Sequence, residues 1–318
     1  MSKAAPYANL SPDAVIDAVE SAGVYTDGRL LALNSFENRV YQVGVEDGTP
    51  IVAKFYRAGR WSDAAIGEEH AFAAELAEAE LPVVAPLKVD NSTLLHHAGF
   101  RFALYPRQGG RAPELESADT LAWVGRLLAR MHGIGSRARF RERGAIDRAT
   151  FIAAPSKIVL ASALLPDTAR DRYARAVARL DALIAQRWAW VDPLPTLRLH
   201  GDCHAGNVLW TDGGPHFVDL DDARTGPAVQ DLWMLATNPR AMDALLEGYE
   251  EFRDFDRREL ALIEPLRLMR QIHYAGWIAQ RWDDPAFPLA FPFASEPRWW
   301  EQHVNDLQEA ASTLEESA

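Results

Sequence analysis

Residues 199–222 read LHGDCHAGNVLWTDGGPHFVDLDD, and the predicted fold follows from this stretch. Its pattern predicts a strand, a tight polar loop, a second strand, a turn at Asp212-Gly213-Gly214 and a third strand, because an Asp-Gly pair between apolar runs is typical of a hairpin. Asp202 and Asn207 lie in the polar loop, and Asp219 lies at the end of the third strand. We therefore expect one small β unit to bring two carboxylates and an amide together.

Carboxylates and an amide at this spacing suit phosphoryl transfer. That reaction needs a carboxylate to accept a hydroxyl proton and oxygen ligands to hold Mg²⁺ on the phosphates. Asp202 and Asn207 have the same separation as the Asp and Asn of the protein-kinase signature H-R-D-L-x-x-x-N. Asp219 stands where the Asp of the kinase D-F-G motif would stand. Spacing, order and local structure agree, so the stretch indicates a kinase-like catalytic loop.

Two other interpretations of the loop stay open. His200, Asp202 and His204 could form the H-x-D-x-H ligand set of a metal hydrolase, since alternate residues of a strand face one side. However, the run between them is too turn-rich for a strand, and Asn207 would have no role. Alternatively, the loop could be stabilised by local Asx hydrogen bonds, which would explain one polar residue but not all of them at kinase spacing.

Length and composition set the broad class of protein. The chain has 318 residues, 48% hydrophobic and 25% charged, which suits a globular protein of two lobes or domains. A net charge of -12 argues against nucleic acid as the main partner. Cys203 is the single cysteine, which excludes an intramolecular disulfide and fits a reducing compartment. With no apolar leader and no bilayer-spanning stretch, we expect a cytoplasmic monomer without a membrane partner.

The N-terminal third predicts a helix and antiparallel strands. Ser11 as N-cap and Pro12 at the first helical position start the helix, and Gly23 ends it. Alternating apolar residues and turn residues between them predict hairpins. The expected strands are Leu30–Leu33, Val40–Val45, Ile51–Tyr56, Thr93–Leu95 and Arg101–Tyr105.

Candidate phosphate-binding residues lie on these elements. The polar loop Asn34–Arg39 takes the place of the kinase loop over the phosphates; it lacks G-x-G-x-x-G, but Ser35 and backbone N–H groups could still bind phosphate. Lys54 follows Val52-Ala53 on an apolar strand, as in the kinase V-A-I-K, and a buried lysine needs a partner. Glu69 is the candidate partner, with its neighbour Glu68 as the alternative.

Glu69 belongs to a helix predicted over Ala64–Ala79. After the last strand of this part, Pro106–Gly110 changes from apolar to Pro/Gly-rich, so we place a lobe boundary there. The backbone of Leu104 and Tyr105 would then face an adenine ring held between two lobes.

Beyond this boundary the pattern is mainly helical. Trp277 and Trp282 are interpreted as core residues rather than a base-stacking platform, because their neighbourhood is helical and the chain is acidic. The Pro-rich segment 285–297 is expected to be a surface loop. The expected helices are Thr120–His132, Tyr173–Trp190, Leu232–Thr237, Ala241–Phe255, Arg258–Arg281 and Trp299–Glu315.

Taken together, these motifs resemble the aminoglycoside phosphotransferase and choline kinase family. The pattern HGDxHxxN precedes V-D-x-D, and Gly226-Pro227 comes before Asp231-Leu232, as in that family. The helix ending Leu128–His132 is similar as well. Over nearly the whole chain, the resemblance extends to bacterial stress-response kinases of this family. The runs that carry it are LNSFENRVYQ, KFYRAGRW, LRLHGDCHAGNVLW, FVDLDDARTGPAVQDLWML, EGYEEF, IEPLRLMR and RWDDPAFP.

This resemblance implies an ATP- and Mg²⁺-dependent, non-specific serine/threonine protein kinase that acts in the response to envelope and oxidative stress. Carried over residue by residue, it implies that Asp202 is the catalytic base. Asn207 and Asp219 would hold Mg²⁺, with Asp219 counted among the catalytic residues. Ser35 and Lys54 would contact the nucleotide phosphates.

The chain departs from ordinary protein kinases in three places. His200-Gly201-Asp202 replaces H-R-D, so the arginine that responds to activation-loop phosphorylation is missing. Asp219-Leu220-Asp221 replaces D-F-G. The connection from Asp219 to Asp231 is short and has no A-P-E. For Asp231 itself, the resemblance implies a structural role, in which it braces the catalytic loop through its backbone. Without a peptide-docking segment, the residues alone favour a small hydroxyl substrate, whereas the full-length similarity favours Ser and Thr of proteins.

We expect an α+β, bilobal, protein-kinase-like fold, with a small antiparallel β-rich N-lobe over residues 1–106 and a larger, mainly helical C-lobe over residues 107–318. The expected function is transfer of the ATP γ-phosphoryl group to protein hydroxyls. One alternative is a kinase for a small alcohol such as homoserine, choline or an aminoglycoside. Another is a nucleotide-binding pseudokinase, against which the presence of Asp202, Asn207 and Asp219 argues.

Overall fold

The computed structural model describes residues 6–316, and the chain divides into two compact units. The first unit combines Met1–Gly144 with Thr196–Phe255, and the second combines Ala145–Pro195 with Asp256–Ala318. The segment with the candidate catalytic loop therefore belongs to the same unit as the N-terminal strands.

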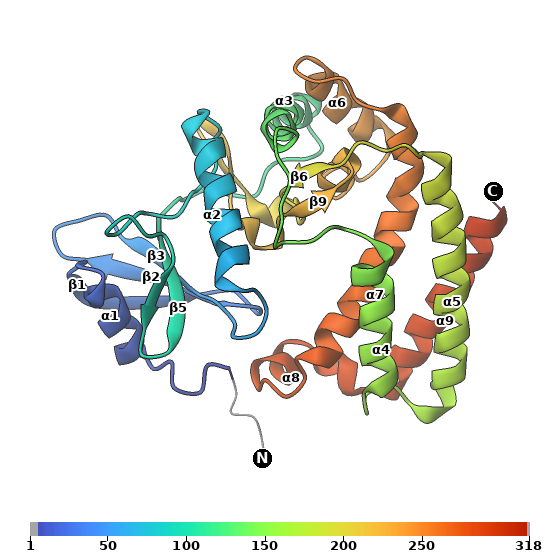
Figure 1. The fold of residues 1–318 in the computed structure, drawn as a ribbon, viewed down its shortest axis with the longest axis horizontal. Helices are drawn as coiled ribbons and strands as arrows, with labels where there is room; N and C mark the ends of the chain where they lie inside the picture. The colour runs from blue at the N-terminus through green and yellow to red at the C-terminus, as the bar shows by residue number, and fades with distance from the viewer. Residues whose placement is uncertain (1–5, 317–318) are drawn as a thin grey trace. The chain divides into compact units, whose positions relative to one another are not determined.

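The first unit contains a five-stranded antiparallel sheet in the order β1-β2-β3-β5-β4 (Figure 1). Successive residues of each strand face opposite sides of the sheet, and in β3 and β5 consecutive residues are buried, so both faces are covered there. The predicted antiparallel hairpins are confirmed, although β1 begins earlier and β4 later than expected. The strands are β1 (Thr26–Leu33), β2 (Arg39–Val45), β3 (Ile51–Phe55), β4 (Leu95–His97) and β5 (Phe100–Pro106).

The two faces of this sheet differ in what they carry. One face packs against α1 (Pro12–Ser21), and its buried core includes Phe55 and Leu104. The register pairs Lys54 with Val40 on β2 and with Ala103 on β5, so Lys54 lies on the opposite face. Lys54 is thus kept off the apolar core by strand periodicity alone.

Helix α2 (Asp63–Glu78) begins at Ser62, whose hydroxyl accepts a hydrogen bond from the N–H of Ala65. Ser62 is therefore a regular N-cap. Ile66 of α2 packs with Tyr56 and Ala103, next to Lys54. The helix thus lies along the Lys54 side of the sheet, where Figure 1 shows it.

Two further helices of the first unit, α3 (Ala118–Gly135) and α6 (Pro239–Glu250), pack very closely against each other. At Gly125, an added Cβ would lie 2.0 Å from the carbonyl oxygen of Leu245. At Gly248, it would lie 1.9 Å from the carbonyl oxygen of Ala122. Only glycine permits this close approach of the two backbones.

Four short strands and three 3₁₀ turns form the part of the first unit that contains the candidate catalytic loop, residues 197–231. Strand β6 (Leu197–Leu199) pairs with β9 (Arg224–Gly226), and β7 (Val208–Thr211) pairs with β8 (Gly214–Phe217), both antiparallel. The β7–β8 hairpin confirms the turn predicted at residues 212–214. Three 3₁₀ turns lie between and after these strands: η2 (Ala205–Asn207), η3 (Leu220–Asp222) and η4 (Ala228–Asp231).

The second unit is helical. Helix α5 packs against α9, and α4 packs against α7. The π-helix η1 and helix α4 were not predicted, because Pro155 lies inside this segment and interrupts the helical pattern. The elements are η1 (Ala149–Ala153), α4 (Ala154–Ala161), α5 (Asp167–Trp190), η5 (Arg257–Leu262), α7 (Ile263–Gln280), α8 (Ala286–Ala290), η6 (Pro292–Ser295) and α9 (Pro297–Glu316).

Two expected elements are wrong. The segment Leu232–Thr237 forms consecutive turns rather than a helix. The residue after it, Asn238, is extended because it precedes Pro239, and it caps α6 instead of continuing a helix. The Pro-rich segment 285–297 is not a surface loop, since Phe287 and Phe291 are buried in an aromatic cluster with Trp277 and Trp282. Trp277 and Trp282 are partly buried and pack against this cluster, which agrees with their interpretation as core rather than base-stacking residues.

The α+β fold with an antiparallel N-terminal sheet and a mainly helical remainder is confirmed. Residue 106 ends β5, and the lobe boundary placed there stays a prediction. Over residues 6–316, helices that combine the length and the apolar character needed to cross a bilayer are not found.

The α3–α6 contact gives a matched pair of variants. We expect Gly125→Ala to destabilise the protein by about 1–3 kcal/mol, because overpacking forces the two backbones apart. Gly133→Ala lies in the same helix with no atom within 4 Å of its added Cβ. It should stabilise the protein by up to about 1 kcal/mol through helix propensity. Denaturant unfolding measures both, and equal effects of the two variants would contradict the packing argument.

Candidate active site

The candidate catalytic loop is held by the buried carboxylate of Asp231 on η4. Its two oxygens accept hydrogen bonds from the backbone N–H groups of His200 and Gly201, each at 2.8 Å. His132 of α3 contacts the same carboxylate through Nε2 at 3.1 Å. The predicted role of Asp231 as a brace of this loop is therefore confirmed.

Gly201 brings the loop close to the acidic segment that follows β8. It has a positive φ of 85°, and an added Cβ would lie 2.1 Å from the carbonyl oxygen of Asp222. Its own carbonyl accepts a hydrogen bond from Gln230 Nε2 at 3.1 Å. The glycine is thus required both for the turn and for the contact between the two segments.

Asp202 and Asn207 are joined within the loop. The side-chain amide of Asn207 donates to the carbonyl oxygen of Asp202 at 3.0 Å. The backbone N–H of Val218 donates to the carbonyl oxygen of Asn207 at 3.0 Å, so Asn207 lies next to Asp219 in space. Since the amide nitrogen is used, its oxygen is directed elsewhere as an acceptor. Asp202 is partly buried, and His204 Nε2 lies 3.6 Å from its Oδ2.

The three residues of the alternative H-x-D-x-H ligand set do not converge. His200 is fully buried and donates through Nε2 to the carbonyl oxygen of Val218 at 2.9 Å. No group of three or more His, Cys, Asp or Glu side chains suited to a metal ion occurs within residues 6–316. The geometry therefore gives the hydrolase interpretation no support.

Asp219 adopts a backbone conformation that non-glycine residues rarely take, with φ 61° and ψ 64°. Such conformations cost about 1–3 kcal/mol and cluster at functional sites. Here the conformation turns the chain directly after β8 and leaves the carboxylate 54% exposed. Its Oδ1 lies 2.7 Å from Lys54 Nζ.

Lys54 is almost completely buried, with 7% of its side chain exposed, and is paired with two aspartates. Asp219 lies at 2.7 Å and Asp221 at 3.4 Å from its ammonium group. Burial works against the charge, but these carboxylates and Glu69 outweigh it and raise the pKa of Lys54 well above its usual value. Lys54 on β3 therefore stays positively charged and lies beside the aspartates that follow β8.

The expected partner, Glu69, does not take part in these ion pairs. It is 2% exposed, and its Oε2 has no hydrogen-bond partner among the described residues. Burial raises the pKa of Glu69 to about 7, although Lys54 and Arg143 lower it. Its neighbour Glu68 instead accepts the backbone N–H groups of Arg141 and Glu142, each at 2.8 Å. Lys54 is paired with Asp219 and Asp221 because both follow β8 onto its side of the sheet.

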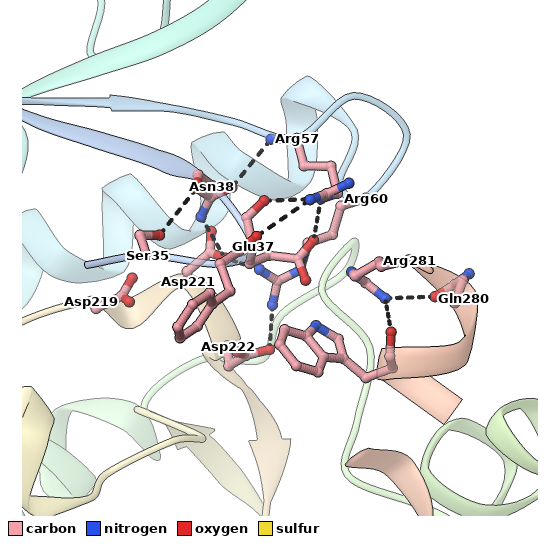
Figure 2. Close-up of polar contacts among 12 residues, drawn as sticks. Ser35, Glu37, Asn38, Arg57, Arg60, Asp219, Asp221, Asp222, Gln280 and Arg281 are labelled. Atoms are coloured by element: carbon pink, nitrogen blue, oxygen red, sulfur yellow. Dashed lines mark hydrogen bonds and ion pairs between the residues drawn. The ribbon is translucent and has the colours of Figure 1, made fainter. Parts of the chain in front are cut away.

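Ser35 lies in the loop between β1 and β2, and its hydroxyl donates to the carbonyl oxygen of Asn38 at 3.2 Å. The buried side chain of Asn38 donates to Asp221 Oδ2 at 3.0 Å and accepts from the N–H of Arg57 at 3.2 Å. Figure 2 shows how Asn38 joins the Ser35 loop to the acidic segment. Ser35 is thus held close to the residues that contact Lys54.

Arg60, in the connection between β3 and α2, binds both aspartates of η3. It donates a hydrogen bond to Asp221 and another, of 2.7 Å, to Asp222 (Figure 2). Glu37 lies 3.9 Å from Arg60 and 3.1 Å from Arg57. Motif spacing did not identify Arg60 or Asn38. The signal available was their place inside the runs KFYRAGRW and LNSFENRVYQ.

Leu104 and Tyr105 on β5 face opposite sides of the sheet. The side chain of Leu104 belongs to the α1 core, and its carbonyl oxygen already accepts the N–H of Leu87 at 2.7 Å. Tyr105 lies on the Lys54 side, with its hydroxyl 2.9 Å from that of Tyr56. A contact of their backbone with adenine stays a prediction.

Comparison with known proteins agrees with this geometry. The model of the phosphotransferase enzyme family matches residues 29–263, which include most of the sheet, the catalytic loop and helices α2 to α6. Stress response kinase A of Escherichia coli strain K12 is 44% identical over 315 residues, covering 98% of this chain and 95% of the relative. The serine/threonine protein kinase RdoA of Salmonella typhimurium strain LT2 is 43% identical with the same coverage.

Solved structures of the same fold are more distant in sequence. Amicoumacin kinase hAmiN, in complex with AMP-PNP, Ca²⁺ and Ami, superposes with a TM-score of 0.72 at 19% identity over 92% of each chain. Spectinomycin phosphotransferase APH(9)-Ia, in complex with ADP and spectinomycin, superposes with a TM-score of 0.65 at 14% identity over 94% of this chain and 97% of that one. These likenesses confirm the kinase-like fold. From the family match and the full-length identity, the chain belongs to the phosphotransferase enzyme family, in the group of the stress response kinase A proteins.

Proposed function

We propose that this protein transfers the terminal phosphoryl group of ATP to Ser or Thr hydroxyls of proteins, with Mg²⁺ as its metal ion. The observation that carries the proposal is the 44% identity over 98% of the chain to stress response kinase A, together with the relative named serine/threonine protein kinase RdoA. A role in the stress response comes from the same relatives. The cytoplasmic location and the monomeric state stay predictions.

The donor atoms near Asp219 fit a magnesium ion. Asp219 supplies a half-exposed carboxylate, and Asn207 beside it has an amide oxygen directed away from its bonded nitrogen. Carboxylate and amide oxygens are the ligands that Mg²⁺ prefers. When bound, the ion would neutralise charge on the phosphates. In this proposal Asn207 and Asp219 hold it, with Asp219 turned toward the site by its left-handed conformation.

Asp202 is proposed as the base that accepts the proton of the substrate hydroxyl. Its backbone is fixed on one side by Asn207 and on the other by the bonds from Asp231 to His200 and Gly201. A base contributes only when it is held within hydrogen-bond reach of the hydroxyl. The rigid backbone around Asp202 supports this role.

The nucleotide is proposed to lie on the Lys54 face of the sheet. Lys54 supplies a fixed positive charge, and Ser35 supplies a hydroxyl and neighbouring backbone groups for the phosphates. On the same face, Leu31 is 58% exposed and Leu33 is 36% exposed, which is unusual for leucines on a sheet. An apolar face beside a positive charge suits the base and the phosphates of a nucleotide.

A second candidate function is phosphorylation of a small alcohol. The connection from Asp219 to Asp231 is taken up by η3, β9 and η4, so this stretch provides no long peptide-docking segment. The solved structures of similar fold include a kinase of amicoumacin and a phosphotransferase of spectinomycin. This observation favours a small substrate, whereas the sequence relatives favour proteins.

Removal of the base gives the first test. Asp202→Asn keeps the shape of the side chain and should lower kcat by about 10²–10⁴-fold, the usual contribution of a general base. Binding of MgATP should persist, because Asp202 does not contact Lys54. Asp181→Asn, in a surface ion pair with Arg148, is the matched control and should behave as wild type. Wild-type kcat in Asp202→Asn would show that Asp202 is not the base.

The metal site gives the second test. Asp219→Ala removes an anionic oxygen ligand, and we expect MgATP affinity and rate to fall together by at least roughly 10–100-fold, the loss seen even for outer-shell partners of metal ligands. Titration calorimetry and steady-state kinetics measure the two quantities. Zinc should restore neither. Tight stoichiometric zinc in the purified protein would instead support the hydrolase interpretation.

The substrate class gives the third test. With labelled ATP, we expect phosphate on Ser or Thr of the protein itself or of myelin basic protein, dependent on Mg²⁺ and abolished in Asp202→Asn. Aminoglycosides, choline and homoserine should give turnover no higher than the background ATPase rate. Saturable phosphorylation of one of these alcohols without labelled protein would replace the protein-kinase proposal by the small-alcohol one, with the fold and the site unchanged.

A further inference from the structure

Two buried carboxylates compete for the role of positioning Lys54. In the kinase arrangement, a helix glutamate pairs with this lysine, and Glu69 of α2 is the residue in that position. In the structure, the lysine pairs with Asp221 at 3.4 Å as well as with the exposed Asp219 at 2.7 Å. Asp221 has 4% of its side chain exposed and is therefore the buried member of this pair.

Asp221 is bound mainly through one carboxylate oxygen. Its Oδ2 accepts from Asn38 Nδ2 at 3.0 Å and from Arg60, whereas its Oδ1 forms an ion pair with Lys54 and has no hydrogen-bond partner among the described residues. Its backbone carbonyl accepts from the buried guanidinium of Arg143. The positive charges beside this carboxylate offset the desolvation cost of burying it. Although burial raises the pKa of Asp221, Arg60 and Lys54 keep it below its usual value.

Glu69 lacks comparable contacts. Its Oε2 is buried and has no hydrogen-bond partner within the described part of the chain. Lys54 acts on it only over a longer distance than an ion pair, as one of several charges around it. A carboxyl group in such surroundings does not fix the direction of an ammonium group.

We propose that Asp221, rather than Glu69, is the residue that positions Lys54 for the phosphates, and that Asp221 couples this lysine to the Ser35 loop through Asn38. The inference deepens the proposed function and rests on it. The carboxylate of Asp221 lies 3.4 Å from the ammonium group on its buried side. This ion pair holds the direction of Lys54 when its hydrogen bond with the exposed Asp219 changes.

The Asn38 contact adds a second consequence. Asn38 accepts from the N–H of Arg57 at the end of β3 and donates to Asp221, while its carbonyl accepts from Ser35. Lys54 and Ser35 therefore both depend on Asp221, Lys54 through its ion pair and Ser35 through Asn38, although they lie on different elements. Loss of Asp221 should disturb both phosphate contacts at once.

The test compares two neutral, nearly isosteric variants. Asp221→Asn should lower kcat/KM for ATP by roughly 10²-fold, the cost of a misplaced catalytic group. Glu69→Gln should lose at least about tenfold less than Asp221→Asn. A loss of roughly 10²-fold or more in Glu69→Gln overturns the proposal. This outcome compares Glu69→Gln with wild type alone, so it can be read even where Asp221→Asn fails to fold. Asp181→Asn and thermal unfolding of each variant control for stability.

A double-mutant cycle separates positioning from a purely structural role. The dissociation constant of MgATP is measured by titration calorimetry for wild type, Asp221→Asn, Lys54→Met and the double variant. If Asp221 acts through Lys54, Asp221→Asn should weaken binding much less in the Lys54→Met background than in wild type. Additive losses in the two backgrounds overturn the proposal.

The outcome also distinguishes this inference from the proposed function. If wild type transfers phosphate from ATP and Asp202→Asn does not, but Asp221→Asn is as active as wild type, the proposed function stands and the inference fails. If wild type neither binds MgATP nor transfers phosphate to any acceptor, the proposed function itself fails.

Discussion

The contact between the carboxylate of Asp231 and the backbone N–H groups of His200 and Gly201 is the constraint on which the site depends. Hydrogen bonds to a charged group contribute about 1.5–3 kcal/mol each, more than ordinary ones. His132 of α3 contacts the carboxylate oxygen that also accepts the N–H of His200, and the hydroxyl of Tyr249 on α6 lies 2.9 Å from the second ring nitrogen of His132. The closely packed helix pair α3–α6 is thus linked by a buried polar chain to the start of the catalytic loop.

A second constraint is the density of negative charge after β8. Asp219, Asp221 and Asp222 lie within one short segment and would repel one another if they were left without cations. Lys54 forms ion pairs with Asp219 and Asp221, and Arg60 forms ion pairs with Asp221 and Asp222. Each buried charge therefore has an opposite charge beside it, as burial requires. The arrangement leaves Asp219 as the exposed carboxylate of the three, and Asp219 is the one proposed as a metal ligand.

Sequence reasoning predicted what local spacing determines. The hairpin at residues 212–214 and the kinase-like loop could be expected from motifs a few residues long, whereas the bracing role of Asp231 was expected from the family resemblance. It missed Asn38 and Arg60, because their partner Asp221 lies 183 and 161 residues away along the chain. Hydrophobic periodicity and motif spacing describe only neighbouring residues, so they do not predict pairs that become close only when the chain folds. The helix expected over Leu232–Thr237 failed for a related reason, since a run of five apolar residues followed by Thr237 can form partly buried turns as readily as a helix.

Arginine contacts within the chain explain how the short connection from Asp219 to Asp231 is held in place. In many protein kinases, a long segment after the metal-binding aspartate is ordered by phosphorylation, through new contacts between arginine and phosphate. Here the equivalent stretch is held by arginine contacts made within the chain: Arg60 binds the side chains of η3, and Arg143 binds the carbonyl oxygens of Asp221 and Ala223. Arginine and acceptor are both supplied by the protein, so the order of this segment does not require an added phosphate.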